Sequence, residues 1–269
     1  MINRIASREE IALMLEWAAA EGWNPGLDDV DAFSQADPRG FFVREVDGAP
    51  IAAISVVNHG DDLAFLGLYL CQPEFRGQGH GYALWHHALA HAGGRTIGLD
   101  GVPAQEANYA RSGFQRTGAS IRYMLDLSGP PVAALDPVVD LGAAIALDRA
   151  VNCADREPFM KAWLTDTPTR RSFSLGRETL ITLRQCREGA KIGPLIASNL
   201  DDAEVLVRGA AAHATGPVFL DIPDANPAAA ALAARLGGVE TFRTARMYRG
   251  TPPATNHTRL FGIATMELG

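Results

Sequence analysis

A glycine-rich loop between an apolar run and a helical pattern is the segment whose residue types could bind a phosphate group. It reads RGQGHG and begins at Arg76, soon after the strand-like run 63–71. Glycine permits positive φ angles and lets the backbone approach a ligand closely. The free N–H groups in the first turn of the following helix, together with the helix dipole, attract anions. Arg76 adds a cation with fork-shaped donors, so the segment predicts a phosphate-binding loop.

Two familiar phosphate-binding motifs do not fit this loop. A Walker loop needs a lysine after its last glycine, and that lysine is missing. A dinucleotide-binding fingerprint needs the order G-x-G-x-x-G after the first strand of a βαβ unit. Here the order is G-x-G-x-G, and the run 63–71 is predicted as the third strand of a meander, after 40–45 and 50–57. Both alternatives therefore fail on spacing and context.

The loop resembles the signature of the GCN5-related N-acetyltransferase (GNAT) family, R/Q-x-x-G-x-G/A after a strand that ends near x-P-x-[YF]. Arg76, Gly79 and Gly81 occupy the fixed positions. The resemblance implies that acetyl-CoA is the co-substrate, with its pyrophosphate on the loop amides and its pantetheine arm along the preceding strand. The residues implied to bind it are Leu70, Cys71, Arg76, Gly77, Gln78, Gly79, His80, Gly81 and Tyr109.

A second match lies downstream, where the family often carries Y-x-x-x-G-F. Tyr109 begins such a run, which ends at Phe114. The resemblance implies that this tyrosine is the general acid, because the departing CoA thiolate needs a proton. The family often has an asparagine seven residues earlier, where this chain has Val102, and the strand 63–71 holds no glutamate that could act as a base. Water or an aspartate could take the proton of the amine, with Asp100 as a candidate.

The acceptor is predicted to be a primary amine, either of a small molecule or of a peptide. Trp23 and Asn24 are predicted to bind it, because they lie in the loop that flanks the acceptor in this family. An alternative is a non-catalytic protein that senses acyl-CoA or acts as a scaffold, and another is an enzyme that uses a longer acyl-CoA. Tyr109 favours an enzyme, since a sensor needs no acid beside the sulfur.

The length of 269 residues and a weak internal repeat predict two domains. A Leu-Asp pair, a loop, a helix and an Arg-x-Gly run follow in the same order over 99–114 and 220–238. We expect an α/β (α+β) fold of two tandem GNAT-like domains, each a mixed, mostly antiparallel sheet flanked by helices. A Ser-Gly-Pro-Pro run places a linker at 128–137, between domains 1–127 and 138–269.

The second domain is predicted to be a degenerate copy that shapes the acceptor pocket. After the predicted strand 192–197 it has no glycine cluster and no arginine, and two aspartates there would repel a pyrophosphate. Ala233 stands where Tyr109 stands in the first domain. The other elements expected in this half are helices over 141–151, 156–164, 201–212 and 228–236, and strands over 171–175, 179–186, 218–222, 244–248 and 261–268.

Composition excludes several other classes of protein. The formal net charge is -7 and no basic patch is visible, which argues against nucleic-acid partners. The three cysteines show no C-x-x-C spacing, which argues against a disulfide framework or a cysteine zinc site. His87 and His91 lie four residues apart, but Ala88 stands where a metalloprotease has glutamate, so we expect no metal.

The sequence also predicts where the protein works. It holds no run of about 18 apolar residues, so no membrane span is expected. No apolar signal region precedes the first predicted helix, which begins near Ser7. We therefore expect a cytoplasmic location.

Overall fold

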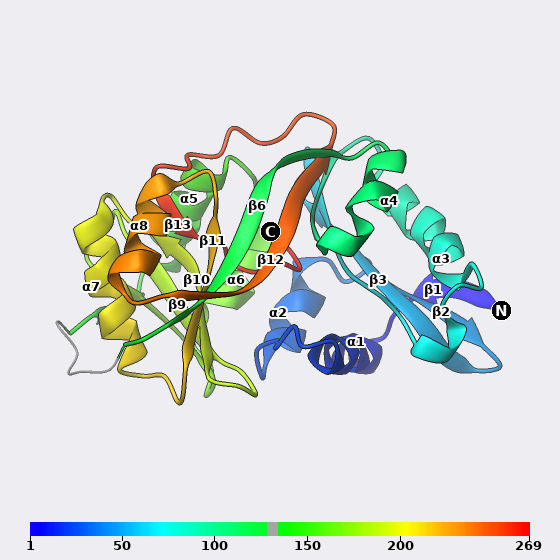
Figure 1. The fold of residues 1–269 in the computed structure, drawn as a ribbon, viewed down its shortest axis with the longest axis horizontal. Helices are drawn as coiled ribbons and strands as arrows, with labels where there is room; N and C mark the ends of the chain where they lie inside the picture. Colours follow the sequence, from blue (N-terminus) through cyan, green and yellow to red (C-terminus); the bar gives the residue numbers. More distant parts are fainter. Residues whose placement is uncertain (128–133) are drawn as a thin grey trace.

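The strands of the described part of the chain form one 13-stranded sheet with helices packed along it (Figure 1). The computed structural model describes residues 1–127 and 134–269, so most of the predicted linker 128–137 lies outside the described residues. The strands are β1 (Ile2–Ile5), β2 (Phe41–Val46), β3 (Ala49–His59), β4 (Leu63–Cys71), β5 (Thr96–Gly101), β6 (Gln115–Leu125), β7 (Asp136–Pro137), β8 (Arg170–Ser174), β9 (Leu180–Gln185), β10 (Ala190–Ile196), β11 (Val218–Pro223), β12 (Val239–Arg249) and β13 (Leu260–Gly262).

Helices follow the strands in a similar order in both halves. The α-helices are α1 (Arg8–Ala20), α2 (Asp29–Ala36), α3 (His80–Leu89), α4 (Glu106–Arg111), α5 (Leu141–Asn152), α6 (Glu157–Leu164), α7 (Leu200–Ala211) and α8 (Pro227–Arg235). Short 3-10 turns cover Pro73–Phe75, Ala90–Ala92 and Pro103–Gln105.

Local sequence explains where the first elements begin and turn. Ser7 and Glu10 form a reciprocal capping box at the start of α1. The buried face of α1 then recurs at helical spacing, including Ile11 and Met14. Asp47 and Gly48, with φ of 51° and 84°, make the tight turn between β2 and β3. These local interactions determine where α1 begins and where the chain turns in the meander that precedes the candidate phosphate loop.

The two halves exchange their long strands. The order along the sheet is β1-β2-β3-β4-β5-β12-β6-β11-β10-β9-β8-β7. Thus β12, from the second half, pairs with β5 of the first half, and β6, from the first half, pairs with β11 of the second. Figure 1 shows both long strands crossing the middle of the molecule, between the two halves. In each half one adjacent pair runs parallel, β4 with β5 and β10 with β11.

A buried ion pair marks each exchange. On β5, Asp100 lies opposite Arg246 of β12, with a carboxylate–guanidinium distance of 2.6 Å. On β11, Asp221 lies opposite Arg122 of β6, also at 2.6 Å. Both pairs are bidentate, and the carboxylates of Asp100 and Asp221 are 0% and 5% exposed. Since each aspartate takes its arginine from the other half of the chain, the two halves depend on each other for charge neutralisation.

The C-terminal segment occupies the cleft of the second half. There β10 and β11 pair in parallel, and β13 pairs antiparallel with the end of β10. The Ile263 N–H donates to the Asp221 carbonyl, so the segment bonds both strands of the cleft. A Cβ atom at Gly193 would lie 2.2 Å from the Ile263 carbonyl oxygen, which leaves no room for a ligand. The chain itself therefore fills the space between these two strands.

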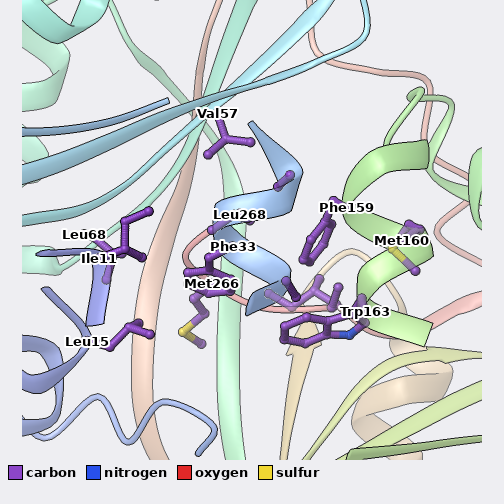
Figure 2. Packing of buried hydrophobic residues seen from close by; sticks show 14 of the residues in the cluster. Ile11, Leu15, Phe33, Val57, Leu68, Phe159, Met160, Trp163, Met266 and Leu268 are labelled. Carbon is purple, nitrogen blue, oxygen red and sulfur yellow. The ribbon is translucent and has the colours of Figure 1, made fainter. Parts of the chain in front are cut away.

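The same segment continues into a core shared by both halves. Met266 and Leu268 pack with Phe33 of α2, and this group extends to Trp163 of α6 (Figure 2). Leu68 of β4 belongs to the same cluster. Burying a side chain of this size contributes about 1.5–3 kcal/mol. Burial in this apolar core therefore holds the end of the chain between the two halves.

The predicted fold class is confirmed, with three differences in detail. The two expected sheets are one continuous sheet, because β6 and β12 exchange places. The strand predicted over 261–268 is wrong beyond Gly262, because the following residues leave the ladder to enter the shared core. The short strand β1 was not predicted. It forms by pairing with the distant strand β2, and a segment of four residues is too short to show a strand pattern in the sequence. The predicted domain limits 1–127 and 138–269 stay predictions.

We predict that Asp100→Asn lowers the free energy of unfolding by about 3 kcal/mol, because it leaves the buried Arg246 cation without its carboxylate. The double variant Asp100→Asn/Arg246→Met should recover part of that loss. Urea denaturation measures both. As a control, Asp201→Asn breaks the exposed pair with Arg235 and should cost under about 1 kcal/mol. Equal effects of Asp100→Asn and Asp201→Asn would contradict the importance of the buried pair.

A second prediction concerns His59, which donates from Nε2 to the Leu268 carbonyl oxygen at 2.8 Å. Burial, and then the charge of Arg156, lower the pKa of His59 from 6.5 to about 4. The folded state therefore resists protonation, so its stability is complete above pH 6.5 and declines as the pH falls towards 4, by up to about 3 kcal/mol. His59→Gln keeps a donor without this titration. The difference in unfolding free energy between wild type and variant should shrink across that pH range; a constant difference would refute the role of His59.

Candidate active site

A cavity opens where β4 and β5 separate. The two strands pair in parallel only from Leu63 to Leu66 on β4. Leu68 then adopts a φ of 45°, and the β3–β4 register shifts beside it. This bulge turns the rest of β4 away from β5. The resulting cavity has a volume of about 450 Å³.

Most of the residues predicted from the sequence line this cavity. The predicted residues on its wall are Trp23, Leu70, Cys71, Arg76, Gly77, Gly79, His80, Gly81, Asp100 and Tyr109. They come from the α1–α2 loop, β4, the glycine loop, β5 and α4. The fold thus brings the two sequence motifs, which lie about 30 residues apart, to a single hollow.

The glycine loop is shaped as an anion cradle. Gly77 and Gly79 have φ angles of 75° and 82°, in the region that favours glycine. A Cβ atom added at either position would meet nothing within 4 Å, so the space above the loop is open. Gly79 is also the N-cap of α3, whose first N–H groups have no side-chain cap. Free amides, an open surface and a helix N-terminus fit a pyrophosphate.

Arg76 is held by the protein itself. Its Nε donates to the Cys71 carbonyl oxygen at 2.9 Å, and its guanidinium pairs with Glu21 at 2.5 Å. The side chain is half exposed. These contacts join the end of β4 to the end of α1, so Arg76 orients the loop and adds positive charge to the rim of the cavity.

Tyr109 stands on the opposite wall, with only 7% of its surface exposed. Its ring stacks on Trp85 at 5.6 Å, and it lies so close to Gly101 that an added Cβ atom would approach its ring to 2.3 Å. Burial, and then the nearby Tyr69, raise the pKa of Tyr109 to about 12. The phenol therefore keeps its proton at neutral pH and can serve as a donor.

Asp100 does not fit the predicted role of base. Its carboxylate has no exposed surface and accepts hydrogen bonds from Arg246, Ser120 and Thr244. Burial raises the pKa of this carboxyl against the opposing effect of Arg246. A carboxylate held in this way is neutralised by Arg246 and presents no exposed surface to a ligand in the cavity. Asp100 instead joins the two halves of the sheet.

The second half holds the loop that carries Trp23 and Asn24. The Trp23 carbonyl oxygen accepts from Lys191 at 2.7 Å and from Arg122 at 3.0 Å. The side chain of Asn24 does not line the cavity; it bonds the backbone of Glu188 in both directions. Trp23 is thus available to a ligand, whereas the prediction that Asn24 contacts the acceptor does not fit, because its amide is committed to positioning the loop.

Gln78 is the other predicted residue outside the cavity wall. Its side chain donates to the Glu74 carbonyl oxygen at 2.8 Å, across the turn that leads into the loop. Any contribution of Gln78 to a phosphate site therefore comes from its backbone. His80 does line the wall, and its Nδ1 accepts from Arg44 at 3.1 Å.

Several lining residues were not predicted. They include Tyr69 on β4, and Arg122, Phe242, Thr244, Met266 and Glu267 from the exchanged strands and the C-terminal segment. Sequence motifs could not indicate the last five, because they reach the cavity through the strand exchange and the threading of the segment after β13. The one sequence feature that could have drawn attention to this segment is the charge of Glu267 within the otherwise uncharged run 260–269.

Two further findings concern metals and membranes. Within the described residues, no group of three or more His, Cys, Asp or Glu side chains is arranged to hold a metal ion. In the same residues, no helix has the length and apolarity needed to cross a bilayer.

Two family models match the chain. The acetyltransferase (GNAT) family model covers residues 9–114, and an acetyltransferase (GNAT) domain model covers residues 144–262. A curated protein, the holothin acyltransferase of Pseudoalteromonas sp. (strain SANK 73390), is 33% identical over 278 residues. The match covers 99% of this chain and 94% of that relative.

Solved structures share the fold over nearly the whole chain. A putative acetyltransferase from Pyrococcus horikoshii has a TM-score of 0.87 at 19% identity, covering 100% of this chain and 95% of that chain. A tandem GNAT protein from the clavulanic acid biosynthesis pathway has a TM-score of 0.60 at 18% identity, covering 93% of this chain and 99% of its own. The predicted arrangement of two related domains in tandem is thereby confirmed.

Proposed function

Because this chain belongs to the GNAT family, with two GNAT domains in tandem, it is an acyltransferase, and we propose that it transfers an acetyl group from acetyl-CoA to a primary amine. The observation that carries the proposal is the meeting of an anion cradle at Gly79 and a buried phenol at Tyr109 on one cavity. The cradle suits the pyrophosphate of the co-substrate. The phenol suits the thiolate that leaves when the thioester is broken.

The bulge in β4 supports the proposal that the pantetheine arm binds along this strand. Leu70 and Cys71 pair with β3 on one side, and beyond Leu66 no pairing with β5 continues on the other. Backbone groups on that side can therefore pair with the amides of an extended ligand. We assign the pantetheine arm to this free edge of β4.

The reaction fits direct attack by the amine. Cys71 is the cysteine on the cavity wall, and burial raises the pKa of its thiol. A protonated thiol is a poor nucleophile, so an acyl-cysteine enzyme is disfavoured. In the direct reaction the amine nitrogen bonds the acyl carbon, the carbon–sulfur bond breaks, and Tyr109 donates its proton to the thiolate.

The acceptor is proposed to be a small molecule with an apolar body. The cavity of about 450 Å³ must also receive the end of the pantetheine arm, which leaves limited room for the acceptor. Trp23, Phe242 and Met266 supply flat or flexible apolar surface on its wall. The relative's name makes holothin the first acceptor to test. Turnover assays with peptides and with longer acyl-CoA thioesters test the two alternative substrates. Localisation of the protein in cells tests the cytoplasmic location.

We predict that acetyl-CoA binds the wild type in the micromolar range, on the order of -8 kcal/mol, and that Gly79→Glu abolishes this binding. Glutamate would strain a backbone with φ of 82° and place a negative charge in the cradle. Isothermal titration calorimetry measures both. The matched control is Gly176→Glu, which adds the same charge at a φ of 73° in the β8–β9 turn of the second half, outside the cavity wall. The proposal fails if wild type does not bind, or if Gly79→Glu binds as well as Gly176→Glu.

We further predict that Tyr109→Phe lowers kcat by about a hundredfold while leaving the affinity for acetyl-CoA nearly unchanged, because only the proton donor is lost. Thiol release with holothin and with a panel of simple amines measures kcat. Tyr123→Phe is the control, since Tyr123 lies on β6 away from the cavity wall. A protein that binds acetyl-CoA but releases no thiol with any acceptor would support a sensor instead. Full turnover by Tyr109→Phe would assign the acid elsewhere.

A further inference from the structure

The cavity contains a buried carboxylate that has no role in the proposal above. Glu267 lines its wall and is only 5% exposed. It lies five residues beyond β13, in the segment that leaves the second cleft and enters the shared core. Carboxylates are seldom buried without a partner or a function, because desolvation of the charge is costly.

Glu267 reaches the cavity at the point where β4 and β5 part. Its main chain packs on β4 so closely that a Cβ atom at Gly67 would lie 2.1 Å from the Glu267 carbonyl oxygen. Gly67 directly follows the last β4 residue paired with β5 and precedes the bulge at Leu68. Tyr109 belongs to the β5 side, against Gly101. A carboxylate and a phenol therefore line the same cavity from its two walls.

The hydrogen bonds of Glu267 leave one oxygen available. The Thr265 hydroxyl donates to Oε2. Among residues 1–127 and 134–269, no donor within hydrogen-bond distance of Oε1 is found. The backbone on the far side is held by the bond of 2.8 Å from His59 to the Leu268 carbonyl oxygen. One fixed oxygen and one unoccupied oxygen suit a proton acceptor in the cavity.

The charges that face Glu267 are committed to other partners. Its carboxylate acts electrostatically on Arg122 of β6, Arg184 of β9 and Lys191 of β10. Arg122 pairs with Asp221, Arg184 pairs with Asp29, and Lys191 donates to the Trp23 carbonyl oxygen. None of the three donates a hydrogen bond to Glu267 among the described contacts. The cations thus supply a positive field without occupying the carboxylate.

The other acids on the cavity wall are engaged. Glu21 pairs with Arg76, and the carboxylate of Asp100 is enclosed with Arg246. Strand β4, for its part, carries no acid on its cavity side. Glu267 is therefore the acid on the described wall that can meet a ligand without first breaking an ion pair.

We propose that Glu267 is the general base of the transfer, an inference that rests on the proposed acyltransferase reaction. Glu267 takes a proton from the acceptor nitrogen as the nitrogen–carbon bond forms. The carbon–sulfur bond breaks, and Tyr109 gives its proton to the CoA thiolate. The proton on Glu267 then passes through solvent to the Tyr109 phenolate, which restores both groups. The net products are the amide and the free thiol, with no proton gained or lost.

The test compares wild type with Glu267→Gln, using holothin and phenethylamine as the acceptors. Glutamine has nearly the same size and can still accept from Thr265, but it cannot take a proton. We expect kcat to fall by about a hundredfold or more, and the affinity for acetyl-CoA and the melting temperature to stay nearly unchanged. In the wild type, kcat/KM should fall as the pH drops, because both the base and the amine are protonated; in Glu267→Gln only the part of this acid limb that belongs to the amine should remain. Glu267→Asp should restore part of the rate.

The remaining outcomes overturn the assignment. Equal rates for wild type and Glu267→Gln would show that the proton leaves by another route. A loss of acetyl-CoA affinity or of melting temperature that accounts for the lost rate would make Glu267 structural. Absence of turnover of both amines by a wild type that binds acetyl-CoA would count against the proposed transfer itself, and the assignment of Glu267 would fall with it. Glu240→Gln, which breaks a surface pair with Arg243, controls for the chemical change and should leave the rate unaltered. Failure of acetyl-CoA binding would instead count against the proposed function.

Discussion

The fold depends on two buried ion pairs whose members come from opposite halves of the chain. Asp100 and Asp221 lie on central strands, where an unpaired carboxylate would cost several kcal/mol. Each is neutralised by an arginine, Arg246 or Arg122, carried in on an exchanged strand. Neither half can complete this arrangement alone, so the two GNAT domains of this chain form one structural unit.

This constraint explains why a half without a glycine loop can still serve the reaction. The space between its strands β10 and β11 is filled by β13, which pairs with β10, and by Ile263, whose N–H donates to the backbone of β11. Strands from both halves then form a wall of the candidate active site: Arg122 of the first half and Lys191 of the second hold the Trp23 loop, and Phe242 of the second half lines the cavity. A domain without a glycine loop thus contributes to the cavity of the other domain.

Local chemistry made the first wall of the cavity predictable. A phosphate cradle needs closely spaced glycines before a helix, and the proposed proton donor Tyr109 lies in a short motif, so both appear as patterns in the sequence. Helix α1 and the β2–β3 turn were predictable for the same reason. The ion pair of Asp100 was not predictable because its partner Arg246 is 146 residues away, and nothing local indicates that their strands pair.

The second wall was not predictable, since it depends on where the end of the chain is threaded. The segment after β13 passes through both clefts: Ile263 closes the second against Gly193, and Glu267 enters the first against Gly67. At both contacts a backbone oxygen packs so close to a glycine that any side chain at that position would prevent the contact. Because one short segment makes both contacts, closing the second cleft also sets the position of the carboxylate in the first. The same short segment therefore fills the space between β10 and β11 and places Glu267 on the wall of the cavity beside β4.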